Sequence, residues 1–106
     1  MKRKIIAVTA CTTGVAHTYL AAQALKRAAK ELDCLIKVET QGATGIDNEL
    51  NERDLELAEV VILAVDTKVS GNERFKGKLV LKVPVSEPLK QGKQVIIDAL
   101  KLVDKQ

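Results

Sequence analysis

The stretch "KIIAVTACTTGVAHTYL", residues 4–20, decides the fold because three local patterns follow one another in it. The run Ile5–Val8 is apolar without alternation, which predicts a strand covered on both faces, as in a parallel sheet. A segment containing Gly14 follows and predicts a turn. From residue 17 to residue 32, apolar residues recur every three or four positions, which predicts an amphipathic helix of about four turns. The stretch therefore indicates a strand, a turn and a helix in succession.

Three more segments indicate strands, at residues 35–40, 60–65 and 79–85. The run "VVILAV" is apolar throughout and predicts a second inner strand. The run "LIKVET" alternates, with Lys37 and Glu39 on its polar face, which predicts an edge strand. The run "LVLKVPV" contains Pro84, and a proline suits an edge strand or a strand end.

Helical patterns separate these strands. Residues 51–59 open on Asn51 as a candidate N-cap, and residues 86–105 open on Ser86, with Pro88 in the first turn. Strands that alternate with helices predict an α/β fold with right-handed crossovers. We expect a four-stranded open parallel sheet with strand order 2-1-3-4 and helices on both faces.

This strand order predicts where a ligand would bind. The topological switch lies between the first and third strands, so a ligand is expected over their carboxyl ends. Cys11 follows the first of these strands and Asp66 follows the third. We therefore expect the functional site at this edge of the sheet.

Composition limits the classes of function. The chain has 106 residues, 46% of them hydrophobic and 29% charged, which predicts one globular domain over residues 1–106. No uncharged apolar run is long enough to cross a bilayer or to form a signal peptide, so a cytoplasmic location is expected. The net charge of +3 is scattered along the chain, and Tyr19 and Phe75 are the only aromatic residues, which argues against nucleic-acid binding.

The two cysteines, Cys11 and Cys34, match neither a CxxC redox pair nor a zinc site. The single histidine, His17, has no cluster of carboxylates at ligand spacing around it, so we expect no metal and no cofactor. Any chemistry at sulfur would be that of one thiol. Cys34 has no acid, base or glycine turn around it and is interpreted as an inert thiol.

The turn after Cys11 has the features of an anion site. A loop that enters a helix N-terminus presents unpaired backbone N–H groups and the positive end of the helix dipole. Gly14 permits a tight turn, and Thr12, Thr13 and Thr18 add hydroxyl donors. The same groups would lower the pKa of the Cys11 thiol and favour its thiolate. The loop therefore suits a thiolate that accepts a phosphoryl group and later releases it.

Other interpretations of this turn remain open. A cysteine at a strand end is often a small buried apolar residue, and His17 is as easily a polar residue of a first helical turn. Cysteine phosphatases use a similar strand, loop and helix, with an arginine six residues after the nucleophile. Here His17 occupies that place, so the guanidinium that would clamp the phosphoryl group is missing, which favours a carrier over a hydrolase. A regulatory module that only retains the loop is a third alternative.

The motifs "CTTGVAHTYLAAQAL", "IKVETQGATG", "NELNERDLELAEVVILAVDTKV" and "RFKGK" together resemble the fructose-type enzyme IIB component of the bacterial phosphoenolpyruvate-dependent sugar phosphotransferase system. The resemblance covers the chain from Lys4 to about Val103. It implies that Cys11 receives a phosphoryl group from a histidine of enzyme IIA and passes it to a sugar bound by the membrane-spanning enzyme IIC. It also implies a cytoplasmic protein that meets the inner face of the membrane through enzyme IIC.

The resemblance extends to further site residues. The expected phosphate-binding residues are Thr12, Thr13, Gly14, Val15, Ala16, His17 and Thr18. The segment Glu39–Gly42, with Gln41, and the segments around Asp66 and Arg74 are expected to flank the loop or to contact a partner. Proline usually follows the cysteine in this family, and Thr12 stands in its place. Threonine restores a backbone N–H and loosens the loop, which indicates a divergent, fructose-like member and leaves the sugar open.

Overall fold

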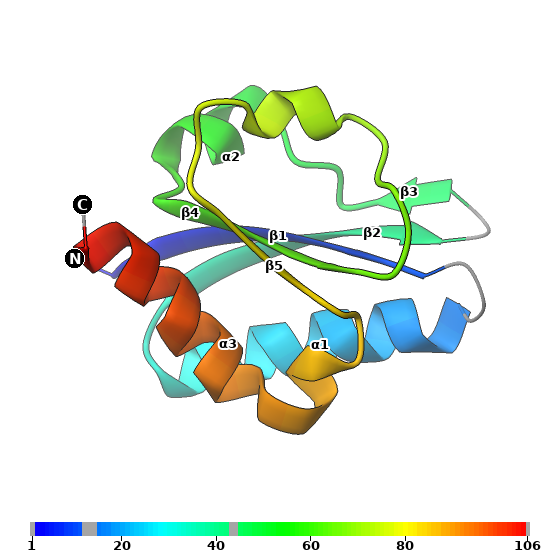
Figure 1. The fold of residues 1–106 in the computed structure, drawn as a ribbon, viewed down its shortest axis with the longest axis horizontal. Coiled ribbons are helices and arrows are strands. Elements are labelled where there is room, and N and C mark those ends of the chain that lie inside the picture. The colour runs from blue at the N-terminus through cyan, green and yellow to red at the C-terminus, as the bar shows by residue number, and fades with distance from the viewer. Residues whose placement is uncertain (1, 12–14, 43–44, 106) are drawn as a thin grey trace.

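The computed structural model describes residues 2–11, 15–42 and 45–105. The strands are β1 (Lys4–Ala10), β2 (Leu35–Gly42), β3 (Gly45–Asp47), β4 (Val60–Val65) and β5 (Val80–Val83), and the helices are α1 (Val15–Glu31), α2 (Glu52–Leu57), the short 3-10 helix η1 (Asn72–Phe75) and α3 (Glu87–Asp104). The strands form one mixed sheet in the order β3-β2-β1-β4-β5. Helices α1 and α3 cover one face, and α2 and η1 cover the other (Figure 1).

The four longer strands run parallel to one another, whereas β3 is antiparallel to β2. The prediction of a four-stranded, purely parallel sheet is therefore wrong. Strand β3 lies in a segment that the sequence indicated as a loop, and it pairs with the end of β2, where Thr40 faces Asp47. The hydroxyl of Tyr19 on α1 donates to the Asp47 carboxylate at 3.0 Å. A strand of three exposed residues has no hydrophobic period of its own, so these contacts from outside it define it.

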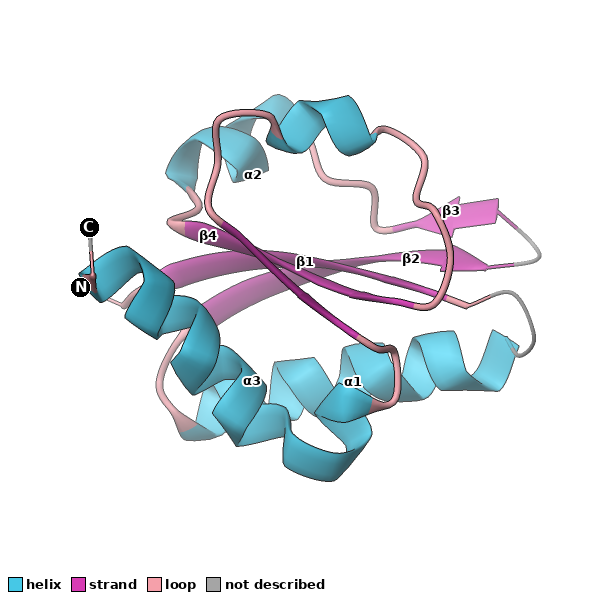
Figure 2. Cartoon of the chain, in the orientation of Figure 1, coloured by secondary structure: helices cyan, strands magenta, loops and turns pink. Residues whose placement is uncertain are grey.

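The inner strands β1 and β4 bury both of their faces, as their apolar runs predicted. Helices lie on both sides of these two strands (Figure 2). Ile5 and Ile62 belong to the cluster under α1 and α3, while Ile6 and Val61 belong to the cluster under α2 and η1. Strand β2 also has a covered polar face, so its prediction as an edge strand with solvent-facing Lys37 and Glu39 fails in part. The cover comes from α2 and η1, whose Asp54 and Arg74 lie 17 and 35 positions from their partners Lys37 and Glu39.

The helix boundaries depart from the predictions at several positions. Helix α1 begins at Val15, two residues before the predicted start. Helix α2 begins on a capping box, in which Asn51 and Asp54 each bind the other's backbone N–H. Ser86 is the N-cap residue of α3, but within the described chain its hydroxyl makes no capping hydrogen bond. In α3 the backbone departs from helical geometry at Gln91.

The two ends of the described chain lie together. Arg3, just before β1, donates to the carboxylates of Glu59 and Asp104, each at 2.9 Å. Asp104 is the last residue of α3, so one guanidinium joins the start of the sheet to the end of the chain (Figure 1). Among the described residues, no helix is both long and apolar enough to cross a membrane.

Candidate functional site

Three of the predicted site residues meet at the carboxyl edge of the sheet. Cys11 directly follows β1 and is half-buried. Its predecessor Ala10 pairs with Gln41 on β2, and the Ala10 carbonyl accepts a hydrogen bond from the Asp66 N–H at 3.1 Å. The ends of β2 and β4 therefore flank the end of β1, and ligand binding at this edge remains a prediction.

The residues of the predicted phosphate loop are described only in part. Thr12, Thr13 and Gly14 lie outside the described residues, and Val15 is described only as the start of α1. Ala16 and His17 follow in the first turn with exposed side chains. Phosphate binding by this loop remains a prediction.

Thr18 differs from its exposed neighbours because it is fully buried. Its carbonyl oxygen accepts a hydrogen bond from the Thr9 hydroxyl at 3.0 Å, which ties the first turn of α1 to β1. Its own hydroxyl has no hydrogen-bond partner in the described part of the chain. The start of α1 is thus fixed to the strand that carries Cys11.

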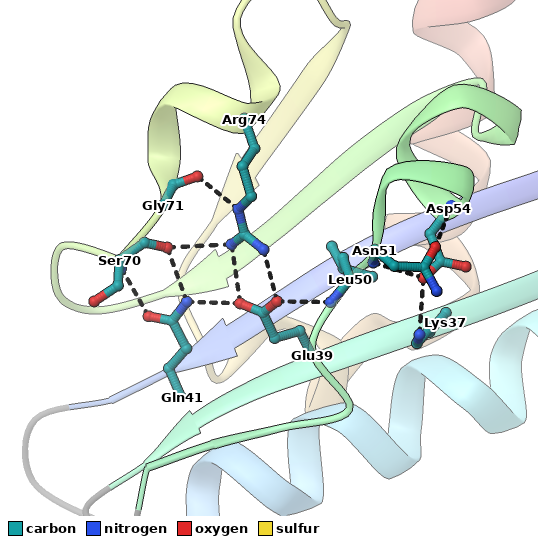
Figure 3. A network of polar contacts seen from close by, with 9 residues as sticks. All are labelled: Lys37, Glu39, Gln41, Leu50, Asn51, Asp54, Ser70, Gly71 and Arg74. Carbon is teal, nitrogen blue, oxygen red and sulfur yellow. Dashed lines mark hydrogen bonds and ion pairs between the residues drawn. The ribbon is translucent and has the colours of Figure 1, made fainter.

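A carboxylate stands at the centre of a polar network beside this edge (Figure 3). Glu39, on β2, is 0% exposed. Arg74 donates to both of its oxygens, from Nη1 at 2.8 Å and from Nη2 at 3.0 Å. The backbone N–H of Leu50 and the side-chain amide of Gln41 add bonds of 2.9 and 2.7 Å. Burial raises the pKa of Glu39, but the bonds from Arg74, Leu50 and Gln41 outweigh burial, so this pKa lies below its ordinary value.

The guanidinium of Arg74 is directed into the protein. Besides its fork onto Glu39, it donates to the Gly71 carbonyl from Nε at 2.7 Å and to the Ser70 carbonyl from Nη2 at 3.1 Å. The hydrogen bonds to Glu39 raise the pKa of Arg74, although burial opposes this. Its plane lies over the Phe75 ring, with Cζ 4.9 Å from the ring centroid. Arg74 thus neutralises Glu39 within the chain.

Gln41 connects this network to the loop after β4. Its amide oxygen accepts from the Ser70 N–H at 2.8 Å, and its amide nitrogen donates to the Ser70 carbonyl at 3.1 Å (Figure 3). The two bonds pair a side chain with one residue's backbone, much as one strand residue pairs with another. Gln41 therefore holds Ser70 against the end of β2.

A second ion pair lies on the same face of β2, farther from the carboxyl edge. Lys37 donates to the Asp54 carboxylate at 2.8 Å, and the Asp54 side chain is 11% exposed. Burial raises the pKa of Asp54, but the bonds from Lys37 and from the Asn51 backbone outweigh it and leave this pKa below its ordinary value. This pair fixes α2 on the sheet. It reaches the Glu39 network only through the backbone, because Asn51, which donates to Asp54, follows Leu50, which donates to Glu39 (Figure 3).

The remaining predicted residues have other surroundings. The Asp66 carboxylate accepts from the Val85 N–H at 3.1 Å, so it holds the chain after β5. Cys34 lies before β2, at the opposite end of the sheet from Cys11, and burial raises the pKa of its thiol. The ion pair of Glu39 was not predicted. One sequence signal could have indicated it. Glu39 lies within a predicted strand, and Arg74 lies in a later loop without a predicted partner inside the chain.

The chain is similar in sequence to known proteins. A family model described as the lactose/cellobiose-specific IIB subunit of the PTS system matches residues 6–98. The chain is 48% identical over 93 residues to the PTS system fructose-like EIIB component 2 of Escherichia coli (strain K12), a match that covers 88% of each protein.

Two further similarities concern a longer relative and a solved structure. The chain is 50% identical over 99 residues to the PTS system fructose-specific EIIABC component of Bacillus subtilis (strain 168); the match covers 93% of this chain and 15% of that protein. The solution structure of an uncharacterized protein, lmo0427, is 68% identical and superposes with a TM-score of 0.93 over 100% of both chains.

Proposed function

The chain belongs to the IIB family of the phosphotransferase system, and from this membership we propose that Cys11 is the residue through which it transfers a phosphoryl group. The donor is a phosphohistidine of a IIA component, and the acceptor is a sugar bound by a membrane IIC component. Proteins of this family act in sugar phosphotransfer. The use of Cys11, of the IIA donor and of the IIC-bound sugar is our proposal.

The proposed reaction has two displacements at phosphorus. The Cys11 sulfur attacks the phosphoryl group, an S–P bond forms, and the P–N bond to the donor histidine breaks. Sulfur attacks as the thiolate, whose proton has passed to solvent, and the released imidazole nitrogen takes up one proton from solvent. In the second step a sugar hydroxyl oxygen attacks, the O–P bond forms, the S–P bond breaks, and sulfur leaves as a thiolate while the hydroxyl proton passes to solvent.

The position of Cys11 carries this proposal. It lies between the end of β1 and the start of α1 at Val15, beside the ends of β2 and β4. The N–H groups of a helix's first turn lack partners within the helix, and the helix dipole is positive there, so both favour a thiolate and a phosphoryl group. The hydroxyls of Thr13 and Thr18 and the ring of His17 are auxiliary donors in this proposal.

The names of the relatives support a proposal for the sugar and for the assembly. Two relatives are named fructose-like or fructose-specific, and another is named for 2-O-alpha-mannosyl-D-glycerate. We propose fructose or a fructose-like sugar. Residues 1–106 then act as one cytoplasmic IIB domain that meets the inner face of the membrane through IIC. One relative carries IIA, IIB and IIC in one named component, which supports these two partners.

Intact-mass measurement tests the proposal. The protein is incubated with phosphoenolpyruvate, the general phosphotransferase proteins and a fructose-type IIA component. Wild type and Cys34→Ser should each gain one phosphoryl adduct, and Cys11→Ser should gain none. Cys34→Ser is the matched control, because it removes the other thiol at the far end of the sheet.

Two results would contradict the proposal. An adduct on folded Cys11→Ser would place the phosphoryl group elsewhere. No adduct on wild type with any IIA donor, together with turnover of a simple aryl phosphate, would identify a cysteine phosphatase instead.

A further inference from the structure

The loop after β4 is fixed at both ends beside Cys11. We call residues 66–71 the edge segment. At its start, the Asp66 N–H donates to the carbonyl of Ala10, the residue before Cys11. At its end, Ser70 exchanges two hydrogen bonds with Gln41. The edge segment therefore runs along the carboxyl edge of the sheet from the end of β4 to the end of β2, the two strands that flank β1.

The end at Ser70 depends on Glu39. The carbonyls of Ser70 and Gly71 are both held by Arg74, and the orientation of Arg74 is set by its two bonds to the Glu39 carboxylate. Glu39 also accepts from Gln41, the residue that clamps Ser70. One buried carboxylate thus orients both side chains that hold the edge segment (Figure 3).

Stability alone gives a weak reason for this arrangement. A buried ion pair is often no more stabilising than well-packed apolar residues of the same volume. What a carboxylate with three donors does provide is a fixed geometry, because each donor must keep its angle and distance. The network therefore fixes the backbone of Ser70 and Gly71 in the edge segment.

We propose that Glu39 is a positioning residue for the Cys11 site. Through Arg74 and Gln41 it holds the edge segment in one conformation. The phosphoryl donor domain docks against this segment. The segment also limits the access of small molecules to the Cys11 sulfur. This inference rests on the proposed function for its donor domain, but the access of small molecules to Cys11 tests it independently.

The experiment compares three variants on a Cys34→Ser background. Glu39→Gln removes the charge that orients Arg74. Arg74→Lys keeps the positive charge but loses the fork, so it separates positioning from electrostatics. Asp54→Asn is the matched control, since it weakens the other ion pair on the same face of β2, and the Asp54 side chain bonds to Lys37 and the Asn51 N–H and to neither Arg74 nor Ser70. All measurements are made at a temperature where every variant is folded by circular dichroism.

Two rates are measured for each variant. For phosphoryl acceptance from the IIA donor, we expect kcat/KM to fall about tenfold in Glu39→Gln and Arg74→Lys, mainly through KM, because docking geometry is lost. For alkylation of Cys11 by iodoacetamide, we expect a rate about threefold higher in the same two variants, because the edge segment opens locally. Asp54→Asn should match the parent in both rates.

The outcomes separate the inference from the proposed function. Parent-like rates of both kinds in Glu39→Gln and Arg74→Lys would overturn the positioning role, as would equal changes in Asp54→Asn. A change in Glu39→Gln alone would show an effect of charge and not of position. If the parent accepts no phosphoryl group but alkylation rises in the two variants, the function fails and the positioning role stands.

Discussion

At the scale of the residue, Glu39 and Arg74 depend on each other because neither reaches much water. The Glu39 side chain is 0% exposed and the Arg74 side chain 19%. Arg74→Met would leave a buried carboxylate without its cation. We expect the free energy of unfolding to fall by about 3 kcal/mol, the cost typical of breaking a buried pair. Urea unfolding followed by circular dichroism measures this difference.

Lys37→Met is the control for that substitution. Its partner Asp54 is closer to solvent and keeps the Asn51 backbone as a donor, so a smaller loss is expected. If both substitutions lowered the free energy of unfolding equally, the deeper burial of Glu39 would not make its ion pair more costly to break.

The same carboxylate makes stability depend on pH. Because its donors outweigh burial, the pKa of Glu39 is lower in the folded chain than in the unfolded chain, where a glutamate titrates at about pH 4.3. The stabilisation is therefore present above that pH and is lost as pH falls through the folded-state pKa. Glu39→Gln should be much less stable than wild type at pH 7, and the gap should narrow toward pH 3. Urea midpoints at both pH values test this, and a constant gap would contradict it.

At the scale of the element, α1 and α3 approach closely at Gly92. A Cβ there would lie 3.4 Å from both the Ala24 carbonyl oxygen and the Ala28 methyl group. Gly92→Val adds two further methyl groups in this contact, so we expect a loss of about 1–3 kcal/mol through overpacking. Thermal unfolding of Gly92→Val against Gln94→Val, an exposed position of the same helix, isolates packing from helix propensity. Similar midpoints for both would show that the helices separate without cost.

At the scale of the whole molecule, the two apolar clusters share the same strands. Ile62 and Leu63 are neighbours on β4, and each belongs to a different cluster. Substituting either by Ala should cost about 2–5 kcal/mol. Because β4 serves both clusters, each variant should still unfold in one transition, with the same midpoint by circular dichroism and by Tyr19 fluorescence. Two separate midpoints would show that the faces unfold independently.

The inner strands and the position of Cys11 were predictable because their signals are local. An apolar run without alternation, as at residues 60–65, has a simple explanation in a strand covered on both faces. Cys11 is identified by the strand before it and the helix after it. The prediction of the longer helices succeeded for the same reason, apart from the first two residues of α1.

Strand β3 and the burial of Glu39 were not predictable in this way. Three exposed residues carry no period, and β3 exists because the end of β2 and Tyr19 bind it. Glu39 alternates with apolar residues and so resembles a solvent-facing residue. Its partner lies 35 positions away in the sequence, on a helix whose placement no local pattern describes.

The guanidinium of Arg3, which binds Glu59 and Asp104, brings both ends of the described chain to one pole of the molecule. Strand β1 runs from that pole to Cys11, a distance of about 20 Å for its length. A polypeptide tether attached at either end would therefore depart away from the sulfur. A segment joined there would begin at the edge of the sheet opposite Cys11.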